Sequence, residues 1–213
     1  MSHYLEVIFY IDAEGEPVRA TRLADWLQVS QPTASVALQR MVRDGLIDIS
    51  ASKVVSLTPL GRKLAARVVR THRIVERWLT DVLGFDWLAA DVHAGALEHA
   101  FAEQVTERLY ALIGEPSTCP HGNPIPGAKA LRLAERSLST LEPGQTSRVL
   151  RISEVTEHET PELLTFLTKS GLQLGAEVRG VEINPGARTQ TVSVADHDVT
   201  MSLEVAAQVW IEV

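Results

Sequence analysis

The chain has 213 residues, of which 45% are hydrophobic, and a formal net charge of −7 at pH 7. This composition is too apolar for a disordered chain. No apolar run reaches the roughly 18 residues of a membrane span, and the N-terminus lacks a signal-peptide pattern. The single cysteine, Cys119, cannot form an internal disulfide. We therefore expect a cytoplasmic protein that does not contact a membrane.

The acidic total is unevenly distributed along the chain. Residues 1–64 contain seven basic and seven acidic side chains, so the whole excess of −7 lies beyond residue 64. An acidic surface repels the phosphates of DNA, whereas a neutral one with clustered basic side chains can bind them. The first segment is therefore free to meet DNA although the whole protein is acidic.

Apolar spacing and turn residues predict three short helices in the first segment: 3–12, 21–27 and 31–44. Ser30 is a suitable N-cap for the third helix, and Pro32 fits its first turn, where a missing N–H costs least. Two short strands at 46–49 and 54–57 follow, with Lys53 at the tip of their hairpin. Helix–turn–helix followed by a β-hairpin is the pattern of a winged helix.

The third helix has the two faces that a recognition helix needs. Its inward side chains are expected to be Val36, Leu38, Met41 and Val42. Its other face carries short polar and cationic groups that can reach base edges and phosphates in a major groove about 12 Å wide. The residues expected to contact double-stranded DNA are Arg19, Arg22, Ser30, Gln31, Pro32, Thr33, Ser35, Gln39, Arg40, Arg43 and Lys53. We assign residues 1–64 to a winged helix-turn-helix DNA-binding domain, although such units also serve as protein-docking modules.

A long amphipathic helix is predicted to begin at Thr58-Pro59 and to run to about Leu83, and two more helices follow it. Helices this apolar, attached to a DNA-reading module, commonly form a two-fold dimer interface. We assign residues 65–127 to a helical dimerisation and metal-binding domain. We expect a homodimer on a palindromic operator, with half-sites one DNA turn apart.

Four residues of this region have the types and the spacing of a metal site: His72, Glu76, Glu98 and His99. The first two are four residues apart on one predicted helix, so they share a face. The other two are adjacent on the next predicted helix. Two helices can thus present imidazole and carboxylate to one ion. Each residue taken singly is also compatible with a solvated helix face.

The last segment changes character to short β-like runs separated by turns: VLRIS, EVRGVEI, TVSVAD, VTMSL and QVWIEV. One helix is predicted at 161–170, where Gly171 ends it. These strands indicate a small β-barrel domain at 148–213, which a linker at 128–147 precedes. The predicted fold class is α+β: a winged helix-turn-helix, an all-α dimerisation domain and a small β-barrel.

Several strings of this sequence resemble the diphtheria-toxin-repressor family of iron- and manganese-dependent transcriptional regulators: SQPTAS, RDGL, LTPLGRKLA, THRIVERWLTDVLGFDW, LEH and TCPHGNPIPG. The motif LLTFLTKSGLQLGAEV resembles the FeoA-like domain that follows in iron-type members. In this family a bound divalent metal orders the first helix against the dimerisation helices and acts as corepressor. The resemblance implies a Mn²⁺- or Fe²⁺-dependent repressor that controls metal homeostasis genes.

The resemblance also implies two metal sites in each chain. The implied ligands of the first site are His72 and Glu76, joined by Glu157 or its neighbours His158 and Glu159. The implied ligands of the second site are Glu98, His99, His3 and Glu6. Arg73 and Asn123 match positions that hold an anion beside the first site in iron-type members.

The sequence departs from the family pattern in two places. Gly95, which cannot ligate, stands where the family has a Cys or Glu three residues before the Glu of LEH. Asp91 stands where the family has the histidine that completes the first site, and His93 lies two residues later. The likeness of DVH to the family's EVH favours His93, and the fixed distance to Glu98 favours Asp91. Both residues stay candidates.

A ligand set of nitrogen and oxygen without thiolate suits Mn²⁺ or Fe²⁺, and Zn²⁺ or Co²⁺ is expected to substitute in vitro. Cys119 falls in the loop before GNPIPG and is interpreted as structural. One alternative is a winged-helix regulator with degenerate metal sites that responds to another effector. A metal-dependent hydrolase is a second alternative. The sequence has no HExxH motif and no nucleophile with a partner base, so we predict that the protein is not an enzyme.

Overall fold

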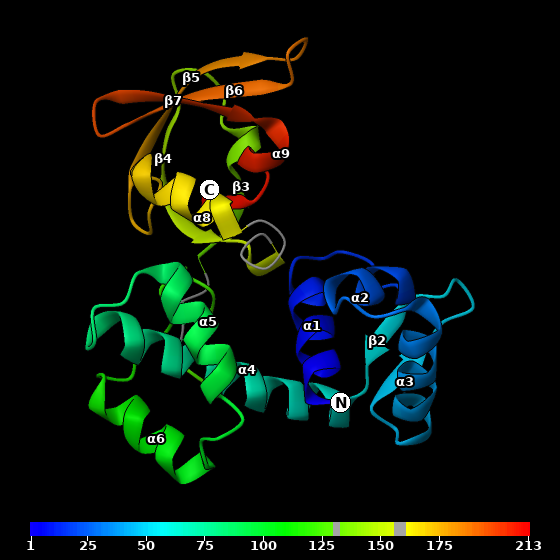
Figure 1. Cartoon of the computed structure of the whole chain (residues 1–213). Helices are drawn as coiled ribbons and strands as arrows, with labels where there is room; N and C mark the ends of the chain where they lie inside the picture. Colours follow the sequence, from blue (N-terminus) through cyan, green and yellow to red (C-terminus); the bar gives the residue numbers. More distant parts are fainter. Residues whose placement is uncertain (130–132, 156–160) are drawn as a thin grey trace.

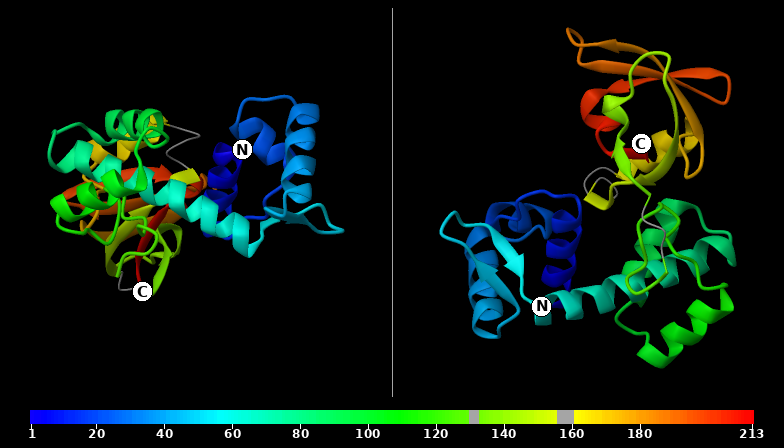
Figure 2. Two further views of the ribbon diagram at one scale, coloured as in Figure 1. Left: turned by 90° about the horizontal axis from the view of Figure 1, so that it is seen from below. Right: turned by 180° about the vertical axis from the view of Figure 1, so that it is seen from behind.

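The computed structural model of the protein describes residues 1–129, 133–155 and 161–213. Its three parts are visible in Figures 1 and 2: residues 1–57, here called the head (blue to cyan), a helical domain (green), and a C-terminal domain (yellow to red). The long helix α4 leaves the head and runs into the helical domain. Among the described residues, no helix is both long and apolar enough to cross a membrane.

The head is a winged helix-turn-helix, as the sequence predicts. Its elements are α1 (Ser2–Ala13), α2 (Ala20–Trp26), α3 (Gln31–Arg43), β1 (Ile47–Ile49) and β2 (Val55–Leu57). The Ser30 hydroxyl accepts a hydrogen bond from the Thr33 N–H at 3.3 Å and thereby caps α3. The two strands pair antiparallel, and Lys53 lies in their connecting turn with a φ of 63°.

The helical domain contains α4 (Pro59–Asp81), α5 (Trp87–Leu97) and α6 (Glu103–Leu112). The Thr58 hydroxyl accepts from the Gly61 N–H at 3.1 Å, and an Asp86 carboxylate oxygen accepts from the Ala89 N–H at 2.8 Å. The Thr58 cap begins α4 where the sequence predicts a helix start, and the Asp86 cap, which the sequence analysis does not predict, begins α5. At 23 residues, α4 is about 35 Å long, which is enough to join two domains.

The C-terminal domain is built on one antiparallel sheet. Its elements are β3 (Glu135–Ser137), the 3₁₀ helix η1 (Leu138–Thr140), β4 (Thr146–Ile152), α8 (Pro161–Lys169), β5 (Glu177–Asn184), β6 (Thr189–Val194), β7 (His197–Ser202), α9 (Leu203–Ala206) and β8 (Val209–Glu212). The strand order is β3-β8-β4-β5-β6-β7. In the described residues β3 and β7 are edges, so the sheet is open and only loosely a barrel. β3 and η1 fall within 128–147, which the sequence assigns to a linker.

The apolar cores show how the domains hold together. One core fills the C-terminal domain and includes Leu138, Leu164 and Ile211, and Trp87 of α5 packs against it. A second core fills the head, and it includes Val155 from the C-terminal part of the chain. The C-terminal domain is therefore packed against both other parts.

The contact between α4 and the wing leaves no room for a side chain at residue 61. A Cβ added to Gly61 would lie 1.9 Å from the Leu46 carbonyl oxygen, whereas one added to Gly95 would meet no atom within 4 Å. We expect Gly61→Ala to lower the free energy of unfolding by about 1–3 kcal/mol, because the backbone must move. Gly95→Ala, also within a helix, should leave it unchanged or raise it by roughly 0.5–1 kcal/mol. Urea denaturation of the metal-free protein measures both. Equal stability of the two variants would contradict the close approach.

Candidate metal centre

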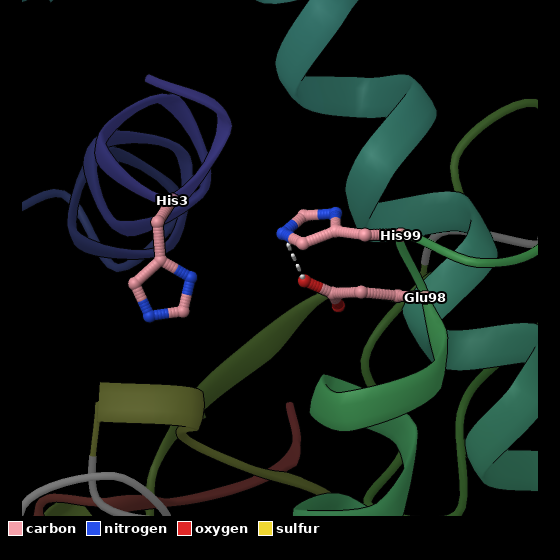
Figure 3. A group of neighbouring side chains, drawn as sticks. All are labelled: His3, Glu98 and His99. Atoms are coloured by element: carbon pink, nitrogen blue, oxygen red, sulfur yellow. Dashed lines mark ion pairs between the residues drawn. The ribbon is translucent and has the colours of Figure 1, made fainter.

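Helix α1 and the end of α5 bring three candidate ligands together (Figure 3). His3 lies in the first turn of α1, and Glu98 and His99 lie directly after α5. His99 Nε2 is 3.4 Å from Glu98 Oε1, and the His3 ring lies across the gap from this pair. One ligand atom of each residue lies within 4.8 Å of the other two. The head and the helical domain thus meet at these side chains.

His72 of α4 belongs to the same group of side chains. Its Nδ1 is 2.8 Å from Glu98 Oε2, and its Nε2 is 3.2 Å from Asp91 Oδ1. Burial lowers the pKa of His72, but its hydrogen bonds with Asp91 and Glu98 outweigh this effect and hold the pKa well above the ordinary value. The carboxylates of Asp91 and Glu98 therefore stabilise the protonated, positively charged form of this imidazole.

Glu6 completes the group from α1, and it is 3% exposed. The Tyr10 hydroxyl donates a hydrogen bond to Glu6 Oε1 at 2.9 Å, and His3 Nδ1 lies 3.4 Å from Glu6 Oε2. Burial raises the pKa of Glu6, but His3, His72 and Tyr10 together lower it below the ordinary value. We call the following set the Glu98 cluster: His3, Glu6, His72, Asp91, Glu98 and His99.

The structure places Asp91 and His93, the two candidate ligands that the sequence leaves open, in different surroundings. Asp91 faces His72 at 3.2 Å. His93 is exposed and stacks edge-on against Phe85, with 5.1 Å between ring centroids. Residues four apart share a helix face, so Asp91 lies on the side of Gly95 and His93 points elsewhere. The geometry favours Asp91 as a member of the cluster.

Gly95 lines a cavity of about 210 Å³ beside the Glu98 cluster. A Cβ built on Gly95 would meet no atom within 4 Å. The position that carries a Cys or Glu in the resembled family is therefore open space here. Asp91, one helical turn earlier, is the carboxylate on this side of α5.

A second group of donors is wholly buried: Glu76, Cys119 and His121. His121 Nδ1 is 2.7 Å from Glu76 Oε1, and the Trp87 ring packs edge-on against the imidazole at 4.9 Å. We call this set the Cys119 cluster. The resemblance implies that Glu76 shares a site with His72; the structure places Glu76 beside Cys119 and His121, and the charge of Glu76 also helps to raise the pKa of His72. The sequence signal for Cys119 and His121, which sequence reasoning missed as candidate ligands, was the Cys-Pro-His string in the TCPHGNPIPG loop, which was interpreted as structural.

The loop that carries this cluster depends on Gly122. Its φ is 90°, and an added Cβ would lie 2.1 Å from the Leu150 carbonyl oxygen. A glycine is needed both for the backbone conformation and for the close approach to β4. This approach brings the loop against the C-terminal domain.

Arg73 and Asn123, which the resemblance assigns to an anion, contact protein groups. Arg73 Nε donates to Glu154 Oε1 at 2.7 Å, and its Nη1 donates to the Pro124 carbonyl. Asn123 Nδ2 donates to the Ile152 carbonyl at 2.9 Å. The guanidinium of Arg73 is buried and already has a carboxylate partner. Burial raises the pKa of Glu154, and the charge of Arg73 only partly offsets that rise.

The surface predicted to bind DNA is exposed along α3 and the wing. The exposed residues are Arg19, Ser30, Gln31, Pro32, Thr33, Ser35, Gln39, Arg40, Arg43 and Lys53. Arg22 is half-buried and lies over Trp26. Val36 and Val42, expected to face inward, are 50% and 42% exposed, and Ala34 packs inward together with Leu38 and Met41.

One candidate ligand, Glu157, lies outside the described residues, as do His158 and Glu159.

Comparisons with known proteins agree with this arrangement of domains. Residues 1–55 match the iron-dependent repressor N-terminal DNA-binding domain, and residues 58–127 match the iron-dependent repressor metal-binding and dimerisation domain. The chain belongs to the iron-dependent repressor family. Residues 136–213 of this family member match the FeoA domain. These are transcriptional repressors, so the expectation that the protein is not an enzyme is confirmed.

Relatives of this repressor match over most of its length. The iron-dependent repressor IdeR of Mycobacterium tuberculosis is 36% identical in an alignment 221 positions long, gaps included, which covers 98% of this chain and 95% of IdeR. The diphtheria toxin repressor of Corynebacterium diphtheriae is 35% identical in an alignment that covers 84% of this chain and 83% of that repressor. A solved manganese-dependent transcriptional repressor in complex with manganese has a TM-score of 0.88 at 30% identity and covers 99% of this chain and 98% of its own.

The Tyr10 hydrogen bond gives a test of the Glu98 cluster. Tyr10→Phe removes the donor from a buried carboxylate, so we expect Glu6 to be less well oriented and Mn²⁺ to bind about 10- to 100-fold more weakly. Tyr110→Phe removes a comparable hydrogen bond, to the Pro116 carbonyl, far from the cluster and serves as control. Isothermal titration of Mn²⁺ measures both. Equal affinities of the two variants would show that Tyr10 does not orient a ligand.

Proposed function

We propose that this family member is a homodimeric repressor whose DNA binding depends on Mn²⁺ or Fe²⁺ held by the Glu98 cluster. The observation that carries the proposal is that this cluster draws side chains from three helices. His3 and Glu6 come from α1 of the head, His72 from α4, and Glu98 from the end of α5. A shared ion is a means of fixing the head relative to the helical domain.

The donor geometry of the Glu98 cluster fits a divalent ion. Two ligands on opposite sides of an ion, with bonds of about 2.0–2.3 Å, lie about 4.0–4.6 Å apart, so donor atoms spread over roughly this distance can converge on one ion with small side-chain movements. The atoms of His3, Glu98 and His99 lie within 4.8 Å of one another, and so do those of Glu6, His72 and Glu98. Carboxylate oxygen and imidazole nitrogen without sulfur suit Mn²⁺ or Fe²⁺. Zn²⁺ or Co²⁺ should bind in vitro as well, since both rank above these ions in intrinsic affinity.

The Cys119 cluster supports a second, distinct site. Its ligand atoms also lie within 4.8 Å of one another. A thiolate makes this donor set softer than the Glu98 cluster, so it should favour Fe²⁺, Co²⁺ or Zn²⁺ over Mn²⁺. Burial of all three residues is typical of a structural metal site. We assign Glu76, Cys119 and His121 to this site, in place of the pairing of Glu76 with His72.

Metal dependence would arise from the residues of α1. His3 and Glu6 would share an ion with Glu98 and so hold α1, and the head with it, in one orientation. The ion changes the conformational equilibrium only through its higher affinity for that orientation. The chemistry supplied by the bound ion is Lewis-acid coordination alone, because a repressor transforms no substrate.

The exposed face of α3 would enter the major groove, and the hairpin with Lys53 would contact a phosphate. The helical domain leaves several apolar side chains exposed, as expected for a surface that a second copy covers: Val82, Leu83, Phe85, Val92, Val105 and Leu112. A two-fold dimer reads a palindromic operator with half-sites one turn apart. Such a protein acts where the chromosome is, in the cytoplasm of a bacterial cell. Its targets would be metal homeostasis genes.

The central test is metal-dependent DNA binding. In a mobility-shift assay with a palindromic promoter fragment, we expect binding with added Mn²⁺ or Fe²⁺ and none with chelator. His99→Ala and Asp91→Asn should each weaken Mn²⁺ binding by about 10- to 100-fold. His93→Ala is the matched control, because this exposed histidine packs on Phe85 instead of facing the cluster. DNA binding that ignores chelator would favour the regulator with another effector.

The recognition face is tested by a charge change on α3. Arg40→Gln should weaken binding to all DNA sequences alike and reduce the salt slope of log K by about 1, if Arg40 contacts one phosphate. Gln39→Ala should lower affinity mainly for the operator, since a base contact carries specificity. Arg188→Gln, which removes an exposed cation in the C-terminal domain, is the control. Fluorescence anisotropy at several salt concentrations separates the two effects. An unchanged salt slope for Arg40→Gln would remove Arg40 from the interface.

A further inference from the structure

The C-terminal domain contacts the head through hydrogen bonds to one carboxylate, that of Glu14. Glu14 directly follows α1. Arg151 Nη1 of β4 donates to Glu14 Oε1 at 2.7 Å, and Trp210 Nε1 of β8 donates to Glu14 Oε2 at 3.1 Å. Both oxygens of a head residue are thus held by strands that lie far along the chain. The side chains of Glu14 and Arg151 are only 8% and 10% exposed.

Arg151 has partners from several parts of the molecule. Its guanidinium lies over the Trp210 ring at 4.5 Å and bonds to both oxygens of Glu135 in β3. Its Nη1 also donates to Asn123 Oδ1 at 3.3 Å. Burial lowers the pKa of Arg151, but Glu135 and Glu14 raise it above its usual value, so the charge is retained. An arginine fixed by this many partners offers Glu14 a preorganised binding site.

Two neighbouring contacts also join this part of the C-terminal domain to the rest of the chain. Glu154, three residues after Arg151, pairs with Arg73 of α4. Val155 is buried in the apolar core of the head. Residues 151–155 therefore contact the head and α4 by hydrogen bonds, ion pairs and apolar packing together. Removing one partner of such a buried pair leaves an uncompensated charge, unlike loss of an exposed pair.

Helix α1 is held at both ends by different groups. Its first turn carries His3 and Glu6 toward Glu98, and its last turn leads into Glu14. A helix of 12 residues is about 18 Å long and close to rigid, so a tilt at one end displaces the other. The position of the two candidate ligands is therefore set partly by the contacts of Glu14.

We infer that the C-terminal domain tunes the metal affinity of the Glu98 cluster by holding the far end of α1. Arg151 and Trp210 are positioning residues that act through Glu14 on His3 and Glu6. This inference rests on the proposed metal function of the Glu98 cluster. It assigns the C-terminal domain a role in sensing through described residues that contact no ion.

The experiment measures the two clusters separately in the full chain. Mn²⁺ is titrated calorimetrically in a Cys119→Ser background, in which the Cys119 cluster lacks its sulfur. Co²⁺ is titrated in the chain with Cys119 intact, and the sulfur-to-cobalt absorption band reports the Cys119 cluster alone. Glu14→Gln keeps the size of the side chain and leaves Arg151 with its other partners. Trp210→Phe keeps a ring under Arg151 and removes only the N–H donor.

We expect Glu14→Gln and Trp210→Phe each to weaken Mn²⁺ binding to the Glu98 cluster by about five- to tenfold, which is in the range of measured couplings between sites. The Co²⁺ band should titrate as in the parent. In the double variant the two effects on Mn²⁺ affinity should be less than multiplicative, because both substitutions act on the contacts of Glu14. Arg188→Gln, which breaks an exposed pair within the C-terminal domain, is the control and should change neither titration.

The other outcomes separate the inference from the function on which it rests. If the Cys119→Ser parent binds Mn²⁺ and the two variants bind it equally well, the inference is wrong and the proposed function stands. If Glu14→Gln weakens both titrations to the same extent, the contact only stabilises the fold, and the inference is again wrong. If the parent binds no Mn²⁺, the assignment of the Glu98 cluster fails, and the inference fails with it.

Discussion

The burial of carboxylates around the middle of α4 is the constraint on which the other features depend. The buried acidic residues there are Glu6, Glu76, Glu98 and Glu154. An ionised carboxylate out of water is costly unless a positive group compensates it. His72 lies among them and is held toward its charged form, whereas burial raises the pKa of Glu98 and of Glu154. Among the described residues, the charges of Glu98 and Glu154 are therefore compensated only in part. In the proposed function a divalent cation would supply the missing positive charge, which would tie metal affinity to the fold.

This constraint also explains why the domains meet where they do. The acidic side chains around α4 come from three parts of the chain: Glu6 from the head, Glu98 from the helical domain and Glu154 from the C-terminal domain. Each part by itself would expose its acidic group to water at little cost. Their packing removes that water, so the charges have to be neutralised together. Under the proposed function, a bound cation would for this reason stabilise this interface in a way that it could not stabilise an apolar one.

Sequence reasoning predicted the elements well and the connections between them only in part. The helices of the head and of the helical domain follow from apolar spacing and from caps such as Ser30 and Thr58, which are local signals. The exposure of Val36 and Val42 was missed, because small Ala34 takes the inward position and the apolar count alone does not reveal which face is buried. β3 was missed because its three residues, Glu135–Ser137, have no alternating pattern and are ordered by pairing with β8.

The candidate site shows the same division between local and tertiary information. The spacing of His72 and Glu76 is visible in the sequence, but the spacing alone cannot show that His72 faces Glu98 and that Glu76 faces His121. Whether Asp91 or His93 faces α4 depends on the rotation of α5, which the packing of Trp87 and Ala94 fixes. The pairing of Glu14 with Arg151 spans 137 residues and has no sequence signal. Contacts of this kind follow only from the assembled domains.

One turn of α4 distributes its side chains among these parts. Successive residues of an α-helix point about 100° apart, so side chains within a turn reach different neighbours. His72 faces Glu98, Arg73 faces Glu154, and Glu76 faces His121. This turn therefore contacts the Glu98 cluster, the C-terminal domain and the Cys119 cluster at once. A rotation of α4 by a fraction of a turn would break all three contacts together. Helix α4 thus fixes where the two clusters lie relative to the C-terminal domain.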